Sequence, residues 1–513
     1  MSWSQQAHAI PTLLKTGHLF LRLRPSFLVL VMDWWILPAI GSLSLALHWW
    51  RGSHRSIPLP PGPKGHLVWG NAIDISRADQ SWVKFGEYAD QYGPLVTLRL
   101  LHQYVFIISD PNLVSELMEK RAANFSDKRP NGMARLTGWD KDILFLPYGP
   151  LLKKYRTMLN RALNNRASLD YVPLQQHEVQ RFMKHLVDTP KDFMAHVHLL
   201  AASIAVRIAY GHKVESQEDQ FVRTAEEHMA GFSESMRPWS SAVNILPSLR
   251  YLPLRFPIFS FQRRALELKR ILDAHSNKPF EFVKAQMASC PSKASITDLL
   301  PDGLPVDDET KEHIKCIAAT LYGAGSDTTV SGVQSFFLAM TLYPDVQARA
   351  QEEIDAYMRN PSRTDAPYTM ISPADRPNLP YTGALVRELL RWHPIVPLVG
   401  HRVGQNGDNL VVSEGNTYQL PAGCLMVINV WKIMHDPEVY EEPDRFIPER
   451  FLVENPPPGP ENYAFGFGRR ICPGLHVAQQ SINLLANFTI TKARDENGVE
   501  IVPEERYSDA IIR

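Results

Sequence analysis

Residues 465–474 read Phe-Gly-Phe-Gly-Arg-Arg-Ile-Cys-Pro-Gly, and this run constrains the fold more than any other part of the chain. Its three glycines let the backbone bend tightly around Cys472 and approach a flat molecule closely. Backbone N–H groups of such a turn can point at the sulfur. A helix that starts after Pro473 would bring its positive end close to it. The run therefore predicts a tight loop that presents a single cysteine sulfur.

Cys472 is a candidate metal ligand. Arg469 and Arg470 bring positive charge, which favours the thiolate over the thiol. A soft thiolate is a strong ligand for a transition metal, and no second Cys or His stands at the spacing typical of a zinc finger. A thiolate held alone fits a haem iron, where it favours O–O cleavage. The alternative is an inert buried cysteine in a glycine-rich loop.

Composition narrows the class of protein. A chain of 513 residues can bury a large core on its own. Its 54 basic and 54 acidic residues give zero formal net charge, which argues against a nucleic-acid partner. Four cysteines make no disulfide framework, and this low number indicates a reducing compartment.

A long helix is predicted over 309–343. Within it, Gly323 and Gly325 each cost about 1 kcal/mol relative to alanine, a cost expected where the backbone opens or another group packs close. Asp327 and Thr328 follow, and they offer an acid and a hydroxyl for a proton path. The alternative is a kinked core helix whose hydroxyl groups bond to the carbonyl four residues earlier.

Four motifs in this order resemble those of the cytochrome P-450 family, the haem-thiolate monooxygenases. The first three lie at 324–329, 388–391 and 446–451. The fourth matches the family's cysteine-loop signature at five positions: Phe465, Gly468, Arg470, Cys472 and Gly474. The likeness extends over nearly the whole chain from Leu59. It is greatest to microsomal fungal members that act on secondary metabolites, similar to O-methylsterigmatocystin oxidoreductase-like enzymes.

The resemblance implies a cofactor, haem b, whose iron Cys472 ligates. Phe465, Gly468 and Gly474 belong to the cofactor-binding loop that the resemblance implies, and Asp327 with Thr328 resembles the family's oxygen-binding groove. Three basic residues resemble the family's partners of the haem propionates: Arg156, His401 and Arg470. The family usually has a Trp where Leu152 stands, so that contact is lost here.

A structural ion cluster is also implied. Glu388 and Arg391 are three residues apart and can pair on one helix face, a spacing that is also common on solvated surfaces. By resemblance, Arg450 joins them in a buried cluster that positions the cysteine loop and is not catalytic.

The amino-terminal part predicts a membrane anchor. Residues 26–50 carry a single charged residue, Asp33, and are long enough to cross a hydrocarbon core. We expect an extension over 1–25, a transmembrane anchor over 26–50, a basic and Pro-rich linker over 51–63, and a haem-thiolate catalytic domain over 64–513. A cleaved signal peptide and a buried core helix are the alternatives.

The fold class predicted is α+β and predominantly α-helical, with a small β-rich part, because helical patterns dominate without an alternating βα rhythm. Strands are expected at 95–101 and 104–108 as a hairpin, and again near 410–412 and 425–430. Helices are expected at 111–120, 151–164, 176–188 and 191–210. By resemblance, the family continues beyond the position of Arg513 into a terminal strand, so we expect an uncovered sheet edge there.

The resemblance implies a membrane-bound monooxygenase of the endoplasmic reticulum, with its catalytic domain facing the cytosol. It would oxidise a lipophilic terpenoid or polyketide with O2, using electrons from NADPH through NADPH-cytochrome P-450 reductase or cytochrome b5. Loops at 132–139 and 232–239 would line the substrate pocket. Two alternatives stay open. One is a haem-thiolate isomerase or dehydratase that needs no O2, against which the pair Asp327 and Thr328 argues. The other is a catalytically impaired membrane protein that retains the fold.

Overall fold

The computed structural model describes residues 57–101, 103–236, 241–251, 260–289, 307–360, 370–411, 416–485, 490–491, 500 and 503. The chain divides into two units, Met1–Pro58 and Leu59–Arg513, and every element below lies in the second unit. The boundary between them falls within the predicted linker. The predicted extension and anchor, and the chain end with its expected sheet edge, lie outside the described residues.

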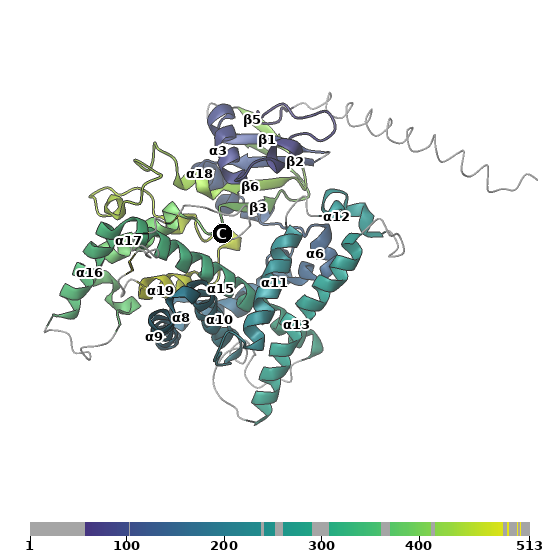
Figure 1. The fold of residues 1–513 in the computed structure, drawn as a ribbon. Coiled ribbons are helices and arrows are strands. Elements are labelled where there is room, and N and C mark those ends of the chain that lie inside the picture. Colours follow the sequence, from purple (N-terminus) through teal and green to yellow (C-terminus); the bar gives the residue numbers. More distant parts are fainter. Residues whose placement is uncertain are drawn as a thin grey trace, which may run out of the picture. The chain divides into compact units, whose positions relative to one another are not determined.

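Helices make up most of the second unit (Figure 1). The longer ones are α3 (Ser81–Tyr92), α7 (Pro150–Leu163), α9 (Val172–Asp188), α10 (Phe193–Tyr210), α11 (Gln220–Met236), α13 (Ser260–Ser289), α15 (Asp308–Leu342), α16 (Pro344–Met358), α17 (Pro380–Trp392) and α19 (Leu475–Leu485). The shorter ones are α2 (Ala72–Ser76), α4 (Pro111–Ser115), α5 (Ala122–Phe125), α6 (Gly132–Thr137), α8 (Asn165–Leu169), α12 (Ala242–Ile245) and α18 (Val430–Met434).

Helix α15 confirms the long helix predicted from the sequence. The Asp307 side chain caps its start by accepting the backbone N–H of Thr310, and Pro344 begins the next helix. Its closest large neighbour is α10, because Gly325 lets the two backbones approach: a Cβ at Gly325 would lie 3.3 Å from the Cβ of Ala205. Close packing of the two helices therefore requires glycine at position 325, despite its low helix propensity.

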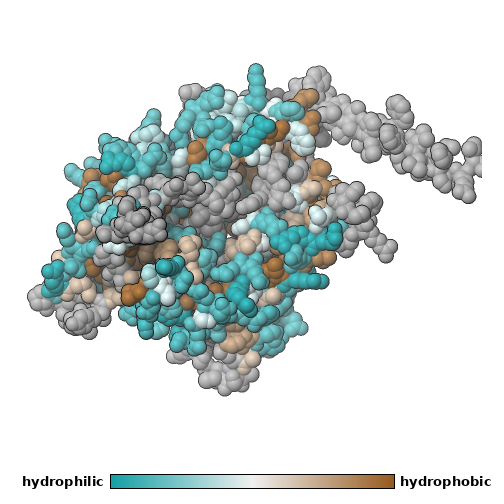
Figure 2. Space-filling model, viewed as in Figure 1, coloured by the Kyte–Doolittle hydropathy of each residue, from teal (hydrophilic) through white to brown (hydrophobic). Residues whose placement is uncertain are grey.

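Helix α10 is a core helix. Among the described residues, its segment Pro190–Tyr210 alone has the length and apolar composition of a membrane span. However, 72% of its most apolar stretch is buried inside the fold, as is typical of a helix in a protein core. In Figure 2, hydrophilic side chains cover most of the coloured surface, and hydrophobic residues form small separate patches.

The main sheet has four strands in the order β1-β2-β6-β3. Strands β1 (Leu95–Leu100) and β2 (Gln103–Ile108) form the predicted antiparallel hairpin; β6 (Leu425–Asn429) pairs parallel with β2; and β3 (Leu398–Arg402) pairs antiparallel with β6. A second sheet pairs β4 (Asp408–Val411) with β5 (Thr417–Leu420). The α+β class is confirmed. Strand β3 was not predicted from the sequence, and it is the strand that carries His401, opposite Met426.

Candidate functional site

The cysteine loop is the tight turn that its glycines predict. Gly466 and Gly468 have φ values of +77° and +49°, which favour glycine over other residues. A Cβ at Gly468 would lie 2.0 Å from the carbonyl oxygen of Met118, so no larger residue fits there. The backbone N–H of Cys472 donates to the Phe465 carbonyl at 2.7 Å, which closes the loop, and α19 begins shortly after it at Leu475.

The charge of Arg156 acts on the sulfur of Cys472. Burial raises the pKa of the Cys472 thiol, while the backbone N–H of Gly474 and the charge of Arg156 act in the opposite direction. The sequence predicted that Arg469 and Arg470 favour the thiolate, whereas the cation that acts on the thiol here is Arg156. Arg469 lies over the ring of Tyr148, 4.8 Å from its centroid, and Arg470 donates to backbone carbonyls instead.

Two of the predicted basic residues tie the cysteine loop to its surroundings. Arg156, on α7, donates Nη1 to the carbonyl of Ile471 at 2.8 Å. Arg470 donates Nε to the carbonyl of Ser126 at 2.9 Å, and it also donates to the carbonyls of Ile143 and Leu146. Burial lowers the pKa of Arg470 to about 10, with Arg156 lowering it further and Asp127 opposing.

His401 is buried beside the same cations. Burial, Lys128 and Arg470 hold its pKa well below the usual range, so the ring is neutral. The backbone of Phe125 opposes this shift, but within the part of the chain that the structure describes neither ring nitrogen makes a hydrogen bond of ordinary geometry. A buried polar ring with open nitrogens is costly unless a further group bonds to it.

Lys128 is a site residue that the sequence reasoning missed. Burial, and next the charge of Arg470, lower the pKa of Lys128 to about 8. No ion pair or hydrogen bond of its ammonium group is found among the described residues. The only sequence signal is a basic residue in a loop, which is too common to single out. Lys128, Arg156, His401 and Arg470 together suit a ligand that carries carboxylates.

Asp327 and Thr328 both lie on α15, and their side chains make different contacts. Thr328 donates its hydroxyl to the Ala324 carbonyl at 2.7 Å, the back-bonding expected of the alternative core-helix interpretation. Burial raises the pKa of Asp327, and His198 of α10 opposes this shift. Within the described residues no hydrogen bond joins the carboxyl group of Asp327 to the hydroxyl of Thr328.

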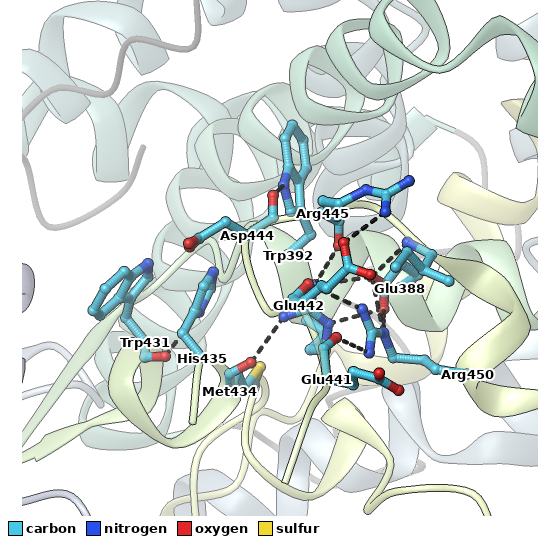
Figure 3. A network of polar contacts seen from close by, with 12 residues as sticks. Glu388, Trp392, Trp431, Met434, His435, Glu441, Glu442, Asp444, Arg445 and Arg450 are labelled. Carbon is cyan, nitrogen blue, oxygen red and sulfur yellow. Dashed lines mark hydrogen bonds and ion pairs between the residues drawn. The ribbon is translucent and has the colours of Figure 1, made fainter. Parts of the chain in front are cut away.

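The structure brings together the three residues of the predicted ion cluster (Figure 3). Arg391 donates Nε and Nη2 to the two oxygens of Glu388 at 2.9 and 2.8 Å, and both side chains are fully buried. Arg450 Nε lies 3.2 Å from both oxygens of Glu388. Arg391 also bonds the carbonyls of Met434 and Arg445, so the cluster holds the irregular segment before the cysteine loop against α17.

The segments 132–139 and 232–239 were predicted as loops that line a substrate pocket. That description is wrong for the described residues, because α6 forms most of the first segment and the end of α11 forms the second. The two segments nevertheless meet in the structure. The rings of Trp139 and Phe232 contact edge to face at 5.6 Å between centroids. Both belong to a separate apolar cluster formed by α6, α11 and α13, which also contains Met133 and Leu268. Residues 237–239 of the second segment lie outside the described residues.

A family model described as Cytochrome P450 matches residues 60–495 of the chain. The chain belongs to the cytochrome P450 family. This finding confirms the resemblance inferred from the four motifs, and it covers the sheets, the helical core and the cysteine loop together.

Curated relatives of this cytochrome P450 are fungal monooxygenases. It is 35% identical over 486 residues to cytochrome P450 monooxygenase claT of Ampulloclitocybe clavipes, covering 92% of each chain. It is 36% identical over 467 residues to cytochrome P450 monooxygenase COX1 of Coprinopsis cinerea, covering 87% of this chain and 88% of the relative. The enzyme is therefore an oxidoreductase that incorporates oxygen from O2. Enzymes of this kind generally use a reductase and a small-molecule substrate.

Solved structures share the fold. A retinoic acid-bound cyanobacterial CYP120A1 matches with a TM-score of 0.64 at 22% identity, covering 84% of this chain and 91% of the other. A zebra fish cytochrome P450 with abiraterone matches with a TM-score of 0.63 at 22% identity, covering 84% and 96%. At these identities the likeness shows the cytochrome P450 fold alone.

The cofactor of the family is haem b, held through a cysteine thiolate. The residues of this cytochrome P450 fit that group. The ring of His401 and the ammonium group of Lys128, which has no ion-pair partner among the described residues, suit the two carboxylates of haem. The glycine-bounded loop presents the sulfur of Cys472.

Proposed function

We propose that this cytochrome P450 is a membrane-bound monooxygenase that oxidises a lipophilic small molecule, a terpenoid or polyketide, in fungal secondary metabolism. One observation carries the proposal: a cluster of basic side chains lies around the cysteine loop. The bond from the Cys472 N–H to the Phe465 carbonyl closes that loop. The fungal monooxygenases at 35% and 36% identity support the monooxygenase class and the fungal setting.

Haem b, when bound, supplies the activation of O2. Cys472 would hold the iron, and Lys128, Arg156, His401 and Arg470 would hold the two carboxylates. The lowered pKa values of Lys128 and of the buried His401 mean that their surroundings disfavour positive charge unless an anion is bound, which supports this assignment.

Protons would reach the pocket along α15. Burial raises the pKa of Asp327, so its carboxyl group can hold a proton closer to neutral pH than an exposed aspartate can. His198 lies beside it, and His198 Nδ1 is 3.5 Å from Glu226 Oε1, both partly exposed to solvent. These two residues form a route from solvent to Asp327. The Thr328 hydroxyl, bonded to Ala324, is the last group of the path.

Electrons would come from NADPH through NADPH-cytochrome P-450 reductase. A groove of about 540 Å³ lies beside the start of α19, three residues after Cys472. Arg376 and Arg387 face Glu461 in it, so its walls carry a positive excess that suits an acidic partner surface. Arg376→Glu should slow reduction by the reductase and leave reduction by dithionite unchanged. Equal slowing of both reactions would contradict docking at this groove.

Residues 26–50 would anchor the enzyme in the endoplasmic reticulum membrane, with the catalytic domain in the cytosol. The support is the length and apolar character of that segment, together with the low cysteine count. Deleting residues 1–50 should move the enzyme from the membrane pellet to the supernatant. A deletion variant that still sediments with membranes would contradict the anchor.

The experiment that tests the function uses the full chain in yeast microsomes with its reductase. A reduced carbon monoxide difference spectrum reports the haem-thiolate bond. Candidate terpenoids and polyketides are then supplied under ¹⁸O2, and the masses of the products are measured by mass spectrometry. One ¹⁸O atom per product molecule is expected. A rearranged product without ¹⁸O would favour an isomerase or dehydratase, and a thiolate spectrum without turnover of any candidate would favour an impaired enzyme.

A further inference from the structure

Three aromatic rings from three helices form a stack above Gly323. The ring of His228, from α11, stacks on His275, from α13, with centroids 3.9 Å apart and 5° between the planes. His275 stacks in turn on Tyr322 of α15 at 4.5 Å and 10°. All three side chains are buried, and His275 and Tyr322 are 0% exposed.

The stack joins two apolar clusters that are otherwise distinct. At one end, the edge of Trp139, in the cluster of α6, α11 and α13, contacts His228 at 5.7 Å. At the other end, Tyr322 belongs to the main core and contacts Tyr210 of α10 at 5.7 Å. The two imidazoles therefore lie between the cluster of α6, α11 and α13 and the helix that carries Asp327.

His275 is also bonded to the backbone of α15. Its Nε2 lies 3.1 Å from the carbonyl oxygen of Ala319, and because a carbonyl only accepts, Nε2 carries the proton. In an α-helix the same carbonyl accepts the N–H of Gly323, four residues later. The histidine of α13 therefore bonds the turn of α15 that ends at Gly323, one residue before Ala324.

Gly323 makes this contact possible. A Cβ at that position would lie 3.3 Å from Cδ2 of His228, 3.4 Å from its Nε2 and 3.5 Å from Nε2 of His275. Both rings are neutral near pH 7, because burial lowers the pKa of His275 to about 4 and that of His228 well below its usual range. Neutral rings can stack closely, whereas two imidazolium ions would repel each other.

We propose that His275, with His228 stacked on it, is a positioning pair that fixes the 319–323 turn of α15. That turn sets the place of the Ala324 carbonyl, which accepts the Thr328 hydroxyl at 2.7 Å. The inference rests on the proposed proton-delivery role of Thr328. Without the bond from His275, the turn moves, the hydroxyl loses its fixed direction, and reducing equivalents are lost as peroxide.

The test compares His275→Phe, which keeps an aromatic ring but has no donor, with His275→Gln, which retains an N–H donor. Ser276→Ala is the control, because among the described residues that hydroxyl bonds the carbonyls of Leu272 and Asp273 in its own helix. Each full-length variant is assayed for product formed per NADPH consumed. Hydrogen–deuterium exchange of peptides covering 316–330 reports the backbone of α15 independently of turnover.

We expect His275→Phe to lower coupling about 3- to 10-fold and to speed amide exchange at 319–324. We expect His275→Gln and Ser276→Ala to stay within about 2-fold of the parent. Equal loss of coupling in the Phe and Gln variants, or unchanged exchange in His275→Phe, would overturn the inference.

Thr328→Ala, measured in parallel, separates this inference from the proposed function. If Thr328→Ala uncouples the enzyme and His275→Phe does not, only the positioning role fails. If Thr328→Ala stays coupled, the proposed proton relay fails, and the link from His275 to it fails as well. Should His275→Phe not fold, Gly323→Ala takes its place. Its Cβ would lie 3.3 Å from the ring of His228, which forces the ring to shift by a few tenths of an ångström. Coupling and exchange that both remain unchanged would contradict the inference.

Discussion

Arg156 Nη1 donates to the carbonyl oxygen of Ile471 at 2.8 Å, so helix α7 is bonded to the residue directly before Cys472. The same guanidinium is the cation that lowers the thiol pKa against the effect of burial. Arg156 therefore both fixes the position of the cysteine loop and favours the thiolate form of Cys472, although it lies on a helix far away in sequence.

Replacing Cys472 with Ser should abolish the thiolate-type carbon monoxide spectrum. An alcohol does not ionise near neutral pH and is a poor ligand for the iron, although apolar contacts can still retain some haem. Cys316→Ser and Cys424→Ser serve as controls and should keep the spectrum. Loss of the spectrum in either control, with retention in Cys472→Ser, would mean that another cysteine is the ligand.

Lys128→Gln should release haem about 10-fold faster than the parent enzyme, since a charge-assisted hydrogen bond to a carboxylate is lost. The measurement is haem transfer to excess apomyoglobin, followed by absorbance. The neighbouring Arg129→Gln is the matched control, because Arg129 is 44% exposed and pairs only loosely with Asp127 at 3.6 Å. Equal release rates in the two variants would remove Lys128 from the site.

Glu388→Gln should destabilise the protein by about 3 to 5 kcal/mol, because it leaves two buried guanidinium groups without their carboxylate. Glu442→Gln makes the same chemical change in an exposed pair with Arg445 and should cost less than about 1 kcal/mol. Urea unfolding followed by circular dichroism compares the two. A small effect at Glu388 would show that the cluster is not a structural requirement.

Thr328→Ala should leave the carbon monoxide spectrum intact and shift NADPH consumption from product to hydrogen peroxide, because the hydroxyl that ends the proton path is gone. Thr341→Ala is the control on the same helix, where the hydroxyl makes the same type of bond to the Phe337 carbonyl at 2.6 Å. The readout is the ratio of peroxide to product. A matching ratio in both variants would rule out proton delivery by Thr328.

His275 should make stability depend on pH in the acid range. Its pKa is about 4 in the folded protein against an ordinary value of 6.5. A lowered pKa contributes stability that is fully present above about pH 6.5 and is lost as the pH falls through 4. Between pH 7 and pH 5 the loss from this group is about 2 kcal/mol. In His275→Gln, the free energy of unfolding measured in urea should decline less over that interval. An identical decline in the variant and the parent would contradict the lowered pKa of His275.

The sequence by itself determined the chemical character of the site and the local elements. Glycine at 466 and 468, the apolar positions on α15 and the apolar runs of β1 and β2 act over a few residues. Their effect can therefore be predicted from residue order along the chain. Glu388 and Arg391 also share one helix, and their pairing follows from their spacing. Arg450 was placed with them only through the resemblance.

The tertiary structure decided which distant groups meet. Lys128 carries no local signal, and it becomes a site residue only because β3 brings His401, and the cysteine loop brings Arg470, to the same buried place. In the sequence, Gly323 is only a residue that destabilises a helix. Its role becomes clear from the fold, in which His228 and His275 of two other helices pack against it. Burial and contact between residues far apart in the chain depend on how whole elements pack. For that reason, the source of charge at Cys472 and the imidazole stack could not be deduced from residue order alone.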